Sequence, residues 1–109
     1  MSTQPRLDTA SAGEIQVSGD LTLHTVSGLI VDGQKAIRSA QGELVINLAD
    51  VSRFSSAGVA LLLNWLRTAE AANVAVTIKH PPKDMPAILE VCDLNAVFQP
   101  VLSDTLQPE

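Results

Sequence analysis

Residues 47–63 read NLADVSRFSSAGVALLL. The stretch begins with the end of a short apolar run, 43–48, which is typical of a strand covered on both faces. A loop is expected over 49–54. A helix is then expected to begin at the pair of serines and to extend to about Ala72, because serine is a preferred N-cap residue. A strand followed by a loop and a helix is the repeating unit of an α/β fold.

Strand-like and helix-like patterns alternate on both sides of this stretch, and the expected order is β-β-α-β-α-β-α-β. The other strands are expected at 7–10, 15–21, 74–79 and 97–102, and the other helices at 26–40 and 85–92. Thr25 and Asp84 are the expected N-caps of these two helices. The order predicts an α/β domain with a small mixed sheet, in which helices join parallel strands after an initial hairpin. The domain is expected to span residues 6–102, with flexible ends at 1–5 and 103–109.

Composition excludes several classes of function. The chain has 109 residues, of which 46% are hydrophobic and 17% charged, enough apolar material for one packed domain. Its formal net charge of −5 argues against nucleic-acid binding, which needs a basic surface. Cys92 is the single cysteine, so no internal disulfide or cysteine-rich zinc site can form. We expect Cys92 on the buried face of the third helix, as a small hydrophobic residue.

Signals of catalysis are nearly absent. The sequence contains no phosphate-binding glycine loop and no nucleophile elbow, so no catalytic residue, metal or cofactor is expected. His24 and His80 stand far apart and are expected in solvated loops. The N-terminus lacks the apolar stretch of a signal peptide, and the apolar run 59–63 is far too short to cross a membrane. We therefore expect a cytoplasmic protein without direct membrane insertion.

The start of the central helix allows two interpretations. Ser55 or Ser56 can act only as an N-cap, or the loop can also be a docking surface, because unpaired N–H groups and the positive end of the helix dipole lie there. On the helical wheel, one apolar stripe suffices to cover the sheet, and Leu61 and Trp65 lie on a second, flanking stripe. Trp65 either packs onto a neighbouring helix or, if exposed, joins Leu61 as an anchor for a partner.

Three stretches of the chain resemble STAS domains: Ser18–Leu21, Asn47–Leu63 and Leu89–Phe98. This family includes bacterial anti-sigma factor antagonists and a cytoplasmic subunit of Mla-type phospholipid-transport ABC systems. The resemblance covers nearly the whole chain, and it rests on the order and spacing of the stretches. It implies a STAS-like α/β fold and a non-catalytic protein that works by binding other proteins.

In the antagonists, the corresponding loop reads Asp-Ser-Ser-Gly, and the serine before the glycine accepts phosphate from a kinase. Aligned on Gly58, this chain has Ala57 at that position, so no phosphoacceptor is expected. In Mla-type subunits the loop resembles Asp-Thr-small-Gly followed by Leu-Ala-Leu-Leu-Leu. Here Ser56 stands at the threonine, and Ser55 replaces the acidic residue. The Mla-type pattern fits better.

The resemblance therefore implies a subunit that binds the ATPase of such a transporter and supports its assembly or activity. It would associate with the cytoplasmic face of the inner membrane only through that complex. The expected partner-binding residues are Ser55, Ser56, Ala57, Gly58, Leu61 and Trp65. The alternative is a partner-switching regulator like the anti-sigma factor antagonists, with Ser55 or Ser56 as a displaced phosphoacceptor.

Overall fold

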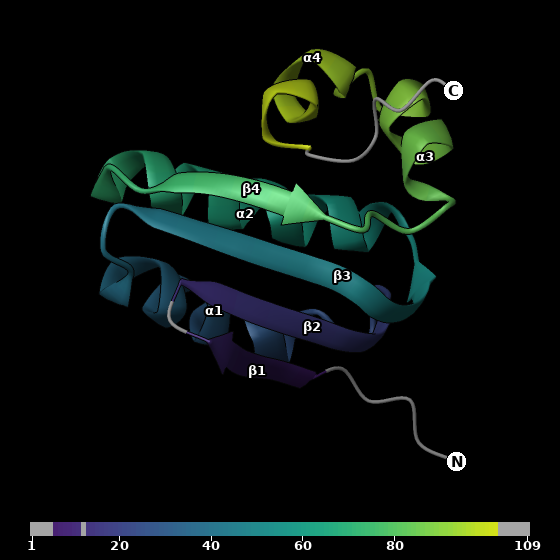
Figure 1. Cartoon of the computed structure of the whole chain (residues 1–109). Coiled ribbons are helices and arrows are strands. Elements are labelled where there is room, and N and C mark those ends of the chain that lie inside the picture. The colour runs from purple at the N-terminus through teal and green to yellow at the C-terminus, as the bar shows by residue number, and fades with distance from the viewer. Residues whose placement is uncertain (1–5, 12, 103–109) are drawn as a thin grey trace.

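The computed structural model describes residues 6–11 and 13–102, in which the strands form one four-stranded sheet (Figure 1). The strands, in their order across the sheet, are β1 (Arg6–Ser11), β2 (Glu14–Leu21), β3 (Glu43–Phe54) and β4 (Ala75–Lys79). β1 pairs antiparallel with β2, whereas β2, β3 and β4 are mutually parallel neighbours. The predicted small mixed sheet with an initial hairpin is therefore confirmed. The expected ends at 1–5 and 103–109 lie outside the described residues.

Two helices connect the parallel strands and lie on the same face of the sheet (Figure 1). These helices are α1 (Ser27–Ser39) and α2 (Ser56–Ala72). Beyond β4 follow the shorter helices α3 (Met85–Val91) and α4 (Asn95–Phe98) and a 3-10 turn (Gln99–Val101). The observed order therefore follows the sequence prediction from β1 through α3.

The strand expected at 97–102 is wrong, because α4 and the 3-10 turn occupy that segment. Phe98 is fully buried and its N–H donates to the Leu94 carbonyl, which is a helical and not a ladder bond. Pro100 has no N–H to give to a sheet. Only Leu102 reaches β4, through one isolated parallel bridge with Ile78.

β3 differs from its prediction in burial and in length. Leu44, Ile46 and Leu48 are buried while the residues between them are exposed or half-buried, so helices cover one face of β3 and not both. The segment 49–54, expected as a loop, continues the strand. It stays paired because two irregularities in the β2–β3 register, after Gln16 and after Gly19, keep the two strands together as far as Phe54.

Two predictions about α3 need correction. The helix begins after Asp84, but the Asp84 backbone is already helical and its side chain makes no capping bond. Cys92 is exposed, because α3 ends at Val91 and leaves Cys92 past the face that Met85 and Leu89 bury. The core lies between the sheet and helices α1 and α2 and is mostly aliphatic, as the composition predicts.

Candidate functional site

The ends of β2 and β3 lie side by side, because Leu21 pairs with Phe54. In open α/β sheets, binding sites form at this carboxyl edge, where strands lead into helices. β2 leads through residues 22–26 into α1, and β3 leads through Ser55 into α2. The third parallel strand, β4, leads through residues 80–84 into α3. We call residues 22–25 the 22–25 turn and residues 55–58 the 55–58 loop.

Of the two serines predicted as alternative N-caps of α2, Ser55 is the cap. Its backbone is extended, with φ −131° and ψ −176°, and its Oγ accepts a hydrogen bond from the Ala57 N–H at 3.1 Å. Its carbonyl oxygen accepts the N–H groups of Gly58 at 2.9 Å and Val59 at 3.3 Å. The bonds from Ala57 and Gly58 satisfy two of the N–H groups that a helix start leaves unpaired, and the bond from Val59 is the first regular bond of α2.

Ser55 also ties α2 to the neighbouring strand. Both its backbone N–H and its hydroxyl donate to the Leu21 carbonyl oxygen, each at 3.2 Å. The hydroxyl therefore acts as donor and acceptor at once. A phosphate on this oxygen would remove the donated hydrogen bond and disturb the cap, so Ser55 is a poor phosphoacceptor position in this conformation.

The other residues of the 55–58 loop differ in accessibility. Ser56 is exposed, and its hydroxyl makes no hydrogen bond to the described part of the chain, whereas Ala57 is half-buried. Gly58 is buried, and a Cβ at that position would lie 2.7 Å from Phe54 Cε1 and 3.2 Å from Leu21 Cβ. Gly58 thus lets α2 begin close to both strands, and it offers no surface to a partner. Ser56 and Ala57 are what the loop presents.

Leu61 and Trp65 are not surface anchors, which corrects the sequence expectation for both. Leu61 is 2% exposed and Trp65 is fully buried. The indole N–H of Trp65 donates to the Ile30 carbonyl of α1 at 3.2 Å. Gly33 of α1 makes room for the ring, because a Cβ there would overlap the indole. Of the two alternatives for Trp65, packing onto the neighbouring helix is therefore correct.

The 22–25 turn exposes an apolar residue that the sequence analysis did not single out. Leu23 is 76% exposed, an unusual placement for a leucine in a short connection. A signal was present, since Leu23 is an apolar residue in a polar turn between a strand and a helix. Thr25, expected as an N-cap, lies one residue too early, because the helix begins at Ser27 after Val26. Its hydroxyl instead accepts from the Thr22 N–H at 2.9 Å.

The residues considered for metal or acid–base chemistry do not converge. His24 and His80 are both exposed, as expected from their loop positions. Within residues 6–11 and 13–102, no group of three His, Cys, Asp or Glu side chains could hold a metal ion. Over the same residues, no helix is long and apolar enough to cross a membrane.

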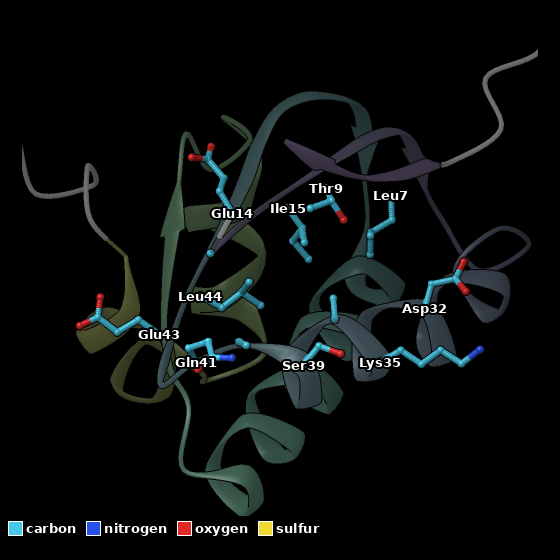
Figure 2. A pocket seen from close by; sticks show the side chains of 13 residues that line it. Leu7, Thr9, Glu14, Ile15, Asp32, Lys35, Ser39, Gln41, Glu43 and Leu44 are labelled. Atoms are coloured by element: carbon cyan, nitrogen blue, oxygen red, sulfur yellow. The ribbon is translucent and has the colours of Figure 1, made fainter. Parts of the chain in front are cut away.

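A groove of about 640 Å³ lies away from the carboxyl edge, between the β1–β2 hairpin and the second half of α1. Figure 2 shows Leu7, Ile15 and Leu44 directed into this groove, while Lys35 and Glu43 extend away from it. The groove has an apolar floor and a charged rim, and it shares no residue with the 55–58 loop or the 22–25 turn.

Comparison with known proteins adds three findings. Residues 7–103 match the protein family described as "Mlab, STAS domain". No curated protein matches the sequence significantly. Several solved structures share the fold, among them three structures of anti-sigma factor antagonists.

The unphosphorylated form of the anti-sigma factor antagonist SpoIIAA superimposes with a TM-score of 0.68 at 21% identity, over 94% of this chain and 89% of that one. The phosphorylated form of the Bacillus cell fate determinant SpoIIAA gives 0.66 at 22%, over 94% and 92%. An anti-sigma factor antagonist from Mycobacterium paratuberculosis gives 0.67 at 20%, over 94% and 86%. At these identities the likeness shows the fold alone.

Proposed function

The chain belongs to the STAS domain family, and from this premise we propose that it is a non-catalytic subunit of an Mla-type phospholipid-transport ABC system. In this role it binds the transporter's ATPase through the 55–58 loop and supports the assembly or activity of the complex. It lies at the cytoplasmic face of the inner membrane and reaches the membrane through the complex. The match to the family described as "Mlab, STAS domain", which covers nearly the whole described chain, supports the proposal of an Mla-type subunit.

The observation that carries the proposal is Ala57. It occupies the position before Gly58 at which the antagonists have their phosphoacceptor serine, and a methyl group cannot take a phosphate. The surface around it is nevertheless ordered for contact: Ser55 fixes the start of α2 by hydrogen bonds, and Ser56 is exposed beside it. A binding surface that has lost its phosphate switch fits a permanent subunit better than a switched regulator.

Co-purification tests this function. The tagged chain is expected to bring down an ABC ATPase from its own cells, and Ser56→Arg is expected to abolish the association, because a long cation would stand in the interface. Ser39→Arg is the matched control, since Ser39 is also an exposed serine but ends α1 at the opposite edge of the sheet. An ATPase that stays bound to Ser56→Arg as well as to Ser39→Arg would place the interface elsewhere.

A second candidate, the partner-switching regulator, is favoured by one observation. Ser56 is exposed with a hydroxyl that no described residue engages, so it remains open to a kinase while Ser55 does not. Phosphate would add a charge of about −1.5 to −2 at this surface. Mass spectrometry of the same purified protein decides between the two: stoichiometric phosphoserine at Ser56 favours the regulator, and unmodified Ser56 beside a bound ATPase supports the subunit.

A further inference from the structure

Leu23 is the most unusual residue of the carboxyl edge. Four large hydrophobic side chains of the described chain are exposed, and they are Leu23, Val31, Val91 and Val97. The three valines lie on α1, α3 and α4 or at their ends, where single exposed apolar residues are common. Leu23 is the largest of the four and lies next to the surface that the proposed function already uses.

The backbone around Leu23 is held in place. The Thr25 hydroxyl donates to the Asp20 carbonyl at 2.7 Å and accepts from the Thr22 N–H at 2.9 Å. The Thr22 carbonyl in turn accepts the N–H groups of Thr25 at 3.0 Å and Val26 at 3.1 Å. These bonds close the turn on both sides of Leu23. The side chain is therefore displayed on an ordered backbone, which lowers the entropy lost when a partner covers it.

The 22–25 turn and the 55–58 loop are also joined where they begin. The Leu21 carbonyl accepts two hydrogen bonds from Ser55, so the residue that leads into the turn is fixed to the residue that begins the loop. Leu23 follows two positions after Leu21, and Ser56 follows directly after Ser55. Leu23 is therefore two residues, and Ser56 one residue, from the hydrogen-bonded pair Leu21 and Ser55, a separation that one protein partner can span.

We propose that Leu23 is the apolar anchor of the partner interface, taking the role that the sequence suggested for Leu61 and Trp65. The partner is a protein with an apolar pocket that receives the Leu23 side chain, and with a surface beside this pocket that covers Ser56. A few side chains near the centre of an interface usually carry most of its affinity. Leu23 is the one large apolar side chain that the 22–25 turn and the 55–58 loop expose. This inference rests on the proposed function, since the partner is the ATPase named there.

Titration of the purified ATPase with the full chain tests the anchor. Leu23→Asp is expected to weaken binding by at least tenfold, and Leu23→Met to leave it within about threefold. Val91→Asp is the matched control, because Val91 is 87% exposed against 76% for Leu23 and lies on α3. Val91→Asp adds the same charge at a similarly exposed apolar residue, and this variant is expected to bind the ATPase like the unmodified chain. Both substituted residues lie at the surface, so far-UV circular dichroism should be unchanged for all three variants.

The outcomes separate this inference from the proposed function. Loss of ATPase binding in the Ser56→Arg and Leu23→Asp variants, but not in Val91→Asp, supports both the Leu23 anchor and the proposed function. If only Ser56→Arg loses ATPase binding, Leu23 is not the anchor, but the proposed function is still supported. Equal weakening by Val91→Asp also overturns the anchor, because added negative charge would then explain the effect. If the unmodified chain binds an anti-sigma kinase and no ATPase, and Leu23→Asp abolishes that binding, the anchor stands and the transporter function fails.

Discussion

Ser55 follows β3 and makes hydrogen bonds both to the end of β2 and to the first turn of α2. Its oxygen caps α2, and its two donors hold the end of β2. Ser55→Ala is expected to lower the free energy of unfolding by about 1 kcal/mol, the usual cost of losing a serine cap. The melting temperature would fall by roughly 5 °C, measured by circular dichroism.

Ser56→Ala is the control for this prediction, because the Ser56 hydroxyl makes no hydrogen bond to the described residues. Its melting temperature should match that of the unmodified chain within about 1 °C. If both alanine variants melt alike, the hydrogen bonds of the Ser55 side chain contribute nothing to stability, and the account of a fixed loop is wrong.

Whether a residue-level feature could be predicted from the sequence depended on how local its cause is. The cap of α2 could be narrowed to Ser55 or Ser56, because a cap depends on neighbours within one turn. Thr25 and Cys92 were misplaced, since a shift of one residue in a helix boundary changes which side chain can cap or face the core. Asp84 stands at the predicted position, but its backbone is helical and its side chain makes no capping bond. Leu23 was missed because its exposure depends on how the 22–25 turn is closed by threonine hydrogen bonds.

At the scale of elements, the contact between α1 and α2 depends on a small and a large residue, Gly33 and Trp65. Trp65 fills the space that Gly33 leaves, and its indole N–H reaches the α1 backbone. Gly33→Ala is expected to destabilise the fold by about 3 kcal/mol, because the ring or the helix must move. Denaturant unfolding of the purified variant measures this cost.

Gly28→Ala is the matched control on the same helix. No atom lies within 4 Å of a Cβ placed there, so alanine meets open space. This variant should be as stable as the unmodified chain or up to about 1 kcal/mol more stable, because alanine favours the helix. A Gly33→Ala variant as stable as Gly28→Ala would contradict the tight packing of Trp65 against α1.

The sequence could not settle which apolar stripe of α2 is covered. The helical wheel identified both stripes, but the burial of Leu61 and Trp65 depends on how closely α1 approaches, and Gly33 decides that distance. The full length of β3 was missed for a similar reason. Its second half is a strand because it pairs, with an irregular register, with β2. Contacts between elements far apart in the chain are not visible in local periodicity.

At the scale of the whole molecule, Trp65 reports on the core, since it is the single tryptophan and is fully buried. Its emission is expected to be blue-shifted and poorly quenched by acrylamide in the native state. On denaturation, the fluorescence and far-UV circular dichroism transitions should have coincident midpoints, because a small domain with one core usually unfolds as a unit. A fluorescence transition that precedes the dichroism transition would mean that the α1–α2 contact opens separately.

The architecture as a whole was the most predictable level. Alternating strand and helix patterns gave the order of elements as far as α3, and the hairpin gave the mixed sheet. The prediction for the segment after α3 was wrong, because the stretch from Val97 to Leu102 has too few residues for periodicity to distinguish a strand from a short helix.

The one-sided covering of the sheet has a consequence for where substitutions destabilise this chain. On the face away from α1 and α2, polar side chains bond mainly to one another, as Gln16 does to Asp50 and Asn47 to Glu14. Substitutions there leave the packed side untouched. Replacing these polar residues is therefore expected to cost less stability than replacing the buried residues on the helix-covered face.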